Sequence, residues 1–139
     1  MNYRKEFERM MQTQTEIALA TAVDYCPNVR VVNFYYDCAA TTLYFSSFGD
    51  NQKIQELEQN PHVAFTTIAQ NGEEHVRVGS GMARKSALTV GEIKDKFLAK
   101  LPGYLMSIPE VLPALVLYEI TFTKADVVVD FEHMESITI

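Results

Sequence analysis

Four polar side chains near the middle of the chain could together hold an anionic ligand. Arg30 lies within an apolar run, Ser46 and Ser47 end the next apolar run, and Lys53 follows six residues later, where we expect the first turn of a helix. Guanidinium, hydroxyl and ammonium groups, with the free N–H groups of a helix N-terminus, are the donors that proteins use to bind phosphate. We therefore predict an anion site formed by these residues.

Each of these side chains also has a purely structural interpretation. An arginine with apolar neighbours on a strand is costly unless an anion meets it, but Arg30 could equally lie at a solvent-facing rim, paired with a carboxylate. Lys53 could be an ordinary solvated lysine, and a cation in the first turn is slightly unfavourable for the helix dipole. The strand alone leaves both interpretations of Arg30 open, whereas the serines and Lys53 favour the phosphate.

Two strands are needed to position Arg30 and the serines. Residues 27–36 and 43–48 are rich in β-branched and aromatic side chains, and the polar residues 37–42 between them indicate the turn of a hairpin. Alternation along the first strand places Arg30 on the same face as Val32, Phe34 and Tyr36.

A helix is needed to position Lys53. Gly49 interrupts the second strand, and Asp50 is a good N-cap ahead of the apolar residues Ile54 and Leu57. The helix should end at Asn60, because the proline that follows cannot continue it.

The rest of the chain predicts more strands than helices. An apolar stripe in residues 3–11 and a capping box formed by Thr89 and Glu92 predict two further helices. We expect the remaining strands at 17–23, 63–68, 74–85, 114–122 and 126–131. Many short strands with few helices favour a mainly β fold with peripheral helices, an antiparallel barrel and not a parallel doubly wound sheet.

The strand at 74–85 carries a row of small residues. Alternation would place Gly79, Gly81 and Ala83 on one face, so that another group can approach the backbone closely. That group could be a flat ring or a second subunit, and the glycines could instead mark a bend at a barrel corner.

Composition narrows the class of protein. The 139 residues suit a single domain, 1–139, and 47% hydrophobic residues suffice for a core. The net charge of −6 argues against nucleic-acid binding, which usually needs a basic face. No apolar run has the length of a membrane span and the N-terminus lacks the apolar segment of a signal peptide, so we expect no membrane association and a cytoplasmic location.

The other reactive side chains form no pattern typical of a metal or catalytic site. The histidines His62, His75 and His133 are scattered, and Cys26 and Cys38 are too few for a disulfide framework or a zinc site. No nucleophile elbow, phosphate-loop or dinucleotide motif is present. We assign no metal ligand and no catalytic residue, which fits a protein whose cofactor carries the chemistry.

Taken in order, several segments resemble the FMN-binding split β-barrel family, the pyridoxamine 5′-phosphate oxidase-like proteins. The similar segments are Pro-x-x-Arg-Val-Val at 27–32, Leu-Tyr-Phe-Ser-Ser at 43–47, the helix with Lys53, Asn-Pro-His-Val-Ala at 60–64 and the glycine-rich strand at 76–83. The resemblance implies an FMN-binding split barrel, an antiparallel Greek-key-like barrel that works as a homodimer with the cofactor at the interface.

The resemblance also assigns roles to residues. It implies that the FMN phosphate contacts Arg30, Ser47 and Lys53, with Ser46 close by, and that Asn51 stands where many relatives have a hydroxyl residue. The backbone at Val31, Val32 and Asn33 would run along the isoalloxazine edge. The second subunit would complete the site with residues 79–83 and with residues near Tyr118.

The implied activity is that of an FMN-dependent oxidoreductase acting on a small molecule, with NADH or NADPH as the candidate reductant. The chain lacks the Arg-x-His motif of true pyridoxamine 5′-phosphate oxidases and contains no tryptophan. We therefore expect a different reducible substrate, such as a quinone or a nitro compound. The alternative is a non-catalytic module that binds FMN, haem or another small ligand as a store or sensor, and a third option uses the deazaflavin F420.

Overall fold

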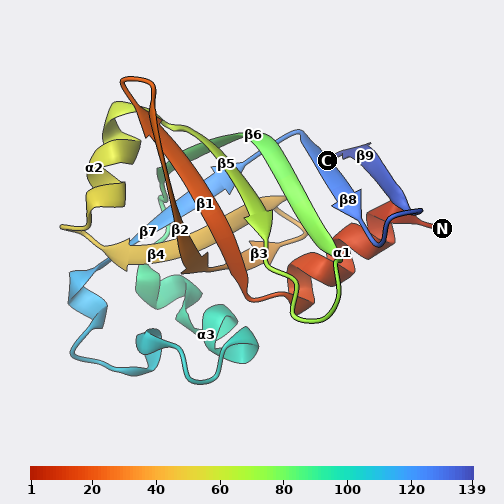
Figure 1. Ribbon diagram of the computed structural model, residues 1–139. Coiled ribbons are helices and arrows are strands. Elements are labelled where there is room, and N and C mark those ends of the chain that lie inside the picture. Colours follow the sequence, from red (N-terminus) through yellow and green to blue (C-terminus); the bar gives the residue numbers. More distant parts are fainter.

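One curled antiparallel sheet forms the frame of the molecule in the computed structural model, which describes all residues from 1 to 139 (Figure 1). The helices are α1 (Tyr3–Thr13), α2 (Gln52–Gln59) and α3 (Val90–Lys100), with 3-10 turns η1 (Leu105–Ser107) and η2 (Leu112–Ala114). The strands are β1 (Glu16–Val23), β2 (Cys26–Asn33), β3 (Tyr35–Asp37), β4 (Thr42–Phe48), β5 (His62–Thr67), β6 (His75–Lys85), β7 (Leu115–Thr121), β8 (Lys124–Val128) and β9 (Met134–Thr138).

The order of the strands explains the barrel. Neighbours run β2-β1-β5-β6-β7-β4-β3, all antiparallel, and β8 pairs with the start of β6 on one side and with β9 on the other. The two end strands of this order, β2 and β3, follow each other in the chain with only Phe34 between them. The sheet must therefore curl to bring its ends together, yet β2 and β3 do not pair. The predicted mainly β fold with peripheral helices, a split barrel, is confirmed.

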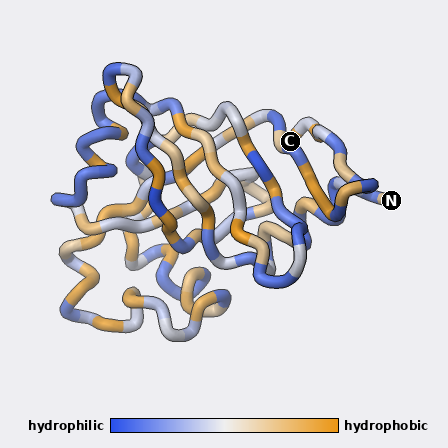
Figure 2. Tube along the Cα trace, viewed as in Figure 1, coloured by the Kyte–Doolittle hydropathy of each residue, from blue (hydrophilic) through white to orange (hydrophobic).

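The barrel interior holds the larger of two cores. Phe7, Met10 and Met11 of α1 are buried against one end of the barrel, as the apolar stripe predicted. Figure 2 shows apolar residues concentrated along the strands, whereas α2 is largely hydrophilic. Because α2 buries only a narrow face, most of its polar residues remain in solvent.

A second core lies on the outer face of β4 and β7. There α3 and η1 pack Phe97 and Met106 against Tyr44 and Leu117. The capping box of Thr89 and Glu92 begins α3, as predicted. With a core on each side, β4 is buried on both faces over all but its last residue.

Three local predictions were wrong. The strand expected at 27–36 is two strands, because the chain breaks at Phe34, where the sheet ends. The N-cap of α2 is Asn51 and not Asp50, since the Asn51 side chain accepts a hydrogen bond from the Lys53 N–H at 3.1 Å. The strand β9 was missed, because its sequence alternates little in polarity.

The small residues of β6 do not share one face. Pairing with β5 shifts by one residue between Val78 and Gly81, which is a β-bulge, and Gly79 is exposed whereas Gly81 is buried. A Cβ at Gly81 would lie 3.2 Å from Val63 Cγ2 and 3.1 Å from Ile120 Cγ2. The close approach at Gly81 is therefore to neighbouring strands, and the expected common face of Gly79, Gly81 and Ala83 is wrong.

None of the helices combines the length and the apolar character that crossing a membrane requires.

Candidate phosphate-binding site

Lys53 is a nearly buried lysine at the end of the barrel covered by α2. The residue is only 8% exposed, and its Nζ donates a hydrogen bond to Ser47 Oγ at 3.0 Å. The turn after β4 and the Asn51 cap start α2 where the first helical turn faces back toward that strand. The interpretation of Lys53 as an ordinary solvated lysine is therefore wrong.

Arg30 projects from β2, opposite Leu19 of β1. Its Nη1 donates to Thr21 Oγ1 at 2.8 Å and to the Leu19 carbonyl at 3.3 Å. Its Nη2 forms an ion pair with Glu56 of α2. Arg30 thus has the carboxylate partner that the structural interpretation required. Its side chain is only 20% exposed, however, so it does not lie at a solvent-facing rim.

The charge of Arg30 acts on Lys53. Burial lowers the pKa of Lys53, and the nearby Arg30 guanidinium lowers it further. No carboxylate forms an ion pair with Lys53, whose ammonium has a single hydroxyl as its partner. A cation held out of water with so little compensation is costly, so an anion placed here would be stabilised.

Ser46 lies away from this cluster. Successive side chains of a strand point to opposite faces, and the Ser46 hydroxyl is hydrogen-bonded to the Tyr104 hydroxyl at 2.7 Å within the second core. The structure brings Arg30, Ser47 and Lys53 to one region and places Ser46 on the other side of β4.

The remaining residues of the predicted set lie at the start of α2 and along β2. Asn51 caps α2. On β2, Val31 is 54% exposed, Val32 is half-buried, and Asn33 donates from Nδ2 to the Thr15 carbonyl at 3.3 Å. Because β2 pairs with β1 alone, one edge of its backbone is free for another partner.

The sequence analysis missed Glu56. This residue is buried although it is charged, and its two oxygens face Arg30 and Asn28. A signal was present, because residues three apart on a helix share a face and Glu56 follows Lys53 at that spacing.

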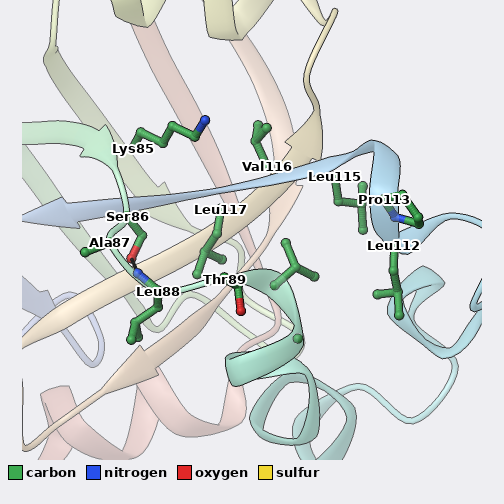
Figure 3. A pocket seen from close by; sticks show the side chains of 12 residues that line it. Lys85, Ser86, Ala87, Leu88, Thr89, Leu112, Pro113, Leu115, Val116 and Leu117 are labelled. Atoms are coloured by element: carbon green, nitrogen blue, oxygen red, sulfur yellow. Dashed lines mark hydrogen bonds between the residues drawn. The ribbon is translucent and has the colours of Figure 1, made fainter.

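A cavity of about 530 Å³ lies between β7 and the start of α3, and Arg30, Ser47 and Lys53 are not among the residues that line it. Figure 3 shows Leu112, Leu115 and Leu117 around the start of α3, with Lys85 and Val116 beyond the β7 ribbon. Val116 stands directly opposite Ser47 in the β4–β7 pair. The volume is that of a small-molecule site, and its lining is mainly apolar.

Solved structures with this fold come from proteins of different kinds. The chain is similar to General Stress Protein 26 of Bacillus anthracis str. Sterne, at 21% identity, 100% coverage of both chains and a TM-score of 0.77. It is also similar to an FAD-binding protein of Mesorhizobium loti, at 19% identity, 88% and 89% coverage and a TM-score of 0.67. A heme-binding protein of Mycobacterium smegmatis matches at 13% identity, 99% of this chain, 58% of its own length and a TM-score of 0.71.

At these identities the similar structures show the fold alone. A comparison with curated proteins found no significant match. The family model described as pyridoxamine 5′-phosphate oxidase-like matches residues 10–133, which are most of the chain and include Arg30, Ser47 and Lys53. The chain therefore belongs to the pyridoxamine 5′-phosphate oxidase-like family.

Proposed function

We propose that this protein binds FMN and acts as an FMN-dependent oxidoreductase on a small molecule. The observation that carries the proposal is the state of Lys53, a nearly buried ammonium with one hydroxyl partner and a neighbouring guanidinium. A phosphate dianion placed beside Lys53 would supply the negative charge that the Lys53 ammonium lacks, with Arg30 and the Ser47 hydroxyl as further donors.

The donor set favours a phosphate ligand over haem. Proteins with this fold include a heme-binding protein and an FAD-binding protein. The ligand of a given chain therefore depends on its own side chains and not on the fold. A haem usually needs an axial ligand such as histidine. Here His62 is exposed, His75 is hydrogen-bonded to the Glu73 carbonyl, and His133 pairs with Asp130. None of these residues contacts Lys53 or Ser47.

In this proposal the protein binds and orients the cofactor. FMN supplies hydride chemistry, which a protein tunes through position, hydrogen bonds and charge. Lys53, Ser47 and Arg30 would hold the phosphate, and the free backbone edge at Val31 to Asn33 would offer N–H and C=O groups to the ring. The free thiols Cys26 and Cys38 are compatible with a reducing compartment, and we place the reaction in the cytoplasm.

We also propose that a second copy of the chain completes the site. Val29 and Val31, on either side of Arg30, are 63% and 54% exposed, and a homodimer would cover them. Gly79 and Met82 of β6 are exposed enough to contribute, whereas Tyr118 is buried against Phe45 and would have to move. Sedimentation analysis should give a dimer, and Val31→Asp should shift it toward the monomer.

The decisive experiment compares ligands that differ in one group. The fluorescence of FMN should be quenched as the protein is added. Riboflavin, which has the same ring without the phosphate, should bind at least about tenfold more weakly. F420, whose tail also carries a phosphate, and haem complete the set. Equal affinity for FMN and riboflavin would contradict the phosphate assignment.

A second measurement separates an enzyme from a binding module. The FMN complex should oxidise NADH or NADPH in the presence of a quinone or nitro acceptor. If FMN binds tightly but no combination of reductant and acceptor gives turnover, the protein would be a non-catalytic module that stores or senses FMN.

A further inference from the structure

The guanidinium that the phosphate site depends on is already engaged by a carboxylate. Arg30 is bound to Glu56 through Nη2, while its Nη1 is occupied by Thr21 and the Leu19 carbonyl. Glu56 is 12% exposed, and its other oxygen accepts from Asn28 Nδ2 at 3.5 Å. The ion pair is therefore held in place from both strand and helix.

Lys53 and Glu56 stand on the same face of α2, one turn apart. Lys53 presents an ammonium that has no acidic partner, and Glu56 presents an acidic group that faces Arg30. A phosphate that contacts both cations must come close to the Glu56 carboxylate. The phosphate and the Glu56 carboxylate are both negative. They would repel each other appreciably, because the effective dielectric constant of a partly buried site is well below that of water.

Two further details raise the cost of binding. The Ser47 hydroxyl donates to the Phe48 carbonyl at 3.1 Å, so it must turn before it can donate to a ligand. Only Nε and one hydrogen of Nη2 remain on Arg30 for a phosphate, unless Glu56 lets go of the guanidinium.

We propose that Glu56 is an internal competitor for the phosphate, which weakens the site and makes the flavin an exchangeable ligand instead of a permanently bound one. This inference rests on the proposed function, because it concerns the same site. The protein would release and rebind FMN as conditions change, and Glu56 would reoccupy Arg30 each time the phosphate leaves.

The test removes the charge of Glu56 and keeps its shape. Glu56→Gln should tighten FMN by about 5- to 50-fold and leave riboflavin unchanged, since only the phosphate meets the carboxylate. The matched control is Glu58→Gln, which changes net charge equally on the exposed face of α2 and should leave FMN affinity unchanged. Stopped-flow mixing should show that the gain comes mainly from slower FMN release.

A second probe does not depend on flavin. Inorganic phosphate alone should raise the melting temperature of Glu56→Gln more than that of the unaltered protein. If Glu56→Gln does not fold, Glu56→Asp tests the contact with Arg30 alone: its shorter side chain keeps the charge but draws back from the guanidinium, so FMN should bind more tightly, by less than removal of the charge would give.

The outcomes separate the two ideas. If the unaltered protein binds FMN but Glu56→Gln binds it equally or more weakly, Glu56 positions Arg30 for the phosphate, and the competitor idea is overturned while the proposed function stands. If neither protein binds FMN up to about 1 mM, the proposed function fails. A phosphate-dependent rise in melting temperature that is larger in Glu56→Gln would still support competition for a different phosphate ligand.

Discussion

Two lysines of this protein, Lys53, which is buried, and Lys100, which is half-buried, have different chemical surroundings. Burial lowers the pKa of both, that of Lys100 to about 7, and neither forms an ion pair with a carboxylate. Lys100 donates to the carbonyls of Met11 and Phe34, each at 3.1 Å, and its Nζ lies 3.6 Å from the centre of the Phe34 ring. Lys53 has one hydroxyl and a second cation nearby.

The difference distinguishes a lysine that connects parts of the fold from one that we propose binds a ligand. Lys100 ends α3 and joins it to the last turn of α1 and to the break between β2 and β3, so its donors serve backbone carbonyls that would otherwise lack partners. Lys53 joins only α2 to β4, and its surroundings add positive charge instead of neutralising it. A buried cation in a positive environment is a candidate for binding an anion, and the proposed phosphate site rests on this.

The largest expected effect is on ligand affinity. Lys53→Met should weaken FMN binding by about 1.5–3 kcal/mol, roughly 10- to 150-fold, because it removes a charge-assisted hydrogen bond to the phosphate. Lys100→Met, the matched substitution at the other lysine, should leave FMN affinity unchanged. Isothermal titration of both variants checks this pair, and equal losses in the two would remove the distinction between the lysines.

The second effect is on stability, where the substitution of Lys100 should have the larger effect. Lys100→Met should lower the free energy of unfolding by about 1–3 kcal/mol, because two backbone carbonyls lose their donor and the Phe34 ring loses its cation. Lys53→Met should be neutral within about 1 kcal/mol, since it removes a desolvated charge with one partner. Urea unfolding of both variants without ligand measures the difference.

The pH dependence of stability sharpens the comparison. The pKa of Lys100 is about 7 in the folded protein and 10.5 as its ordinary value, so between these values the unfolded state binds more protons. Stability should therefore rise with pH across that window, by about 1–2 kcal/mol after the carbonyls and the ring offset part of the cost of the charged form. Unfolding curves over the window should show a flatter profile for Lys100→Met. A fall in stability with pH in the unaltered protein would mean that the ammonium is the favoured form.

The smallest effects concern the two serines of β4. Ser47→Ala should weaken FMN binding by about 1 kcal/mol, and Ser46→Ala should instead lower stability by about the same amount through the loss of its bond to Tyr104. Measuring both quantities in both variants tests whether adjacent hydroxyls serve different sides of the strand. A loss of FMN affinity in Ser46→Ala would place the ligand on the side of the second core.

Much of the fold could be predicted because strong local signals agreed. The apolar stripe of α1 and the capping box of α3 each had one physical interpretation, and both helices form as predicted. The bulge in β6 could not be predicted, because the extra residue at Gly79 and Ser80 depends on pairing with a strand that lies elsewhere in the chain. The break at Phe34 likewise reflects where the sheet ends.

The site could be predicted only in part. The convergence of Lys53 and Ser47 follows from a strand, a short turn and a helix that are contiguous in sequence. The Arg30–Glu56 ion pair joins segments 26 residues apart, and either of the two interpretations of Arg30 was compatible with the sequence. The separation of Ser46 from Ser47 could have been predicted, since adjacent residues of a regular strand point to opposite faces.

The burial of β4 on both faces has a consequence for how the protein responds to its ligand. One strand sends Ser47 toward α2 and Ser46 toward Tyr104, so immobilising it from one side also restrains the layer behind it. Amide hydrogens of η1 and the start of α3 should then exchange more slowly when FMN is present, although they contact no part of it. Slower exchange in the second core would then show that FMN is bound on the opposite face of β4.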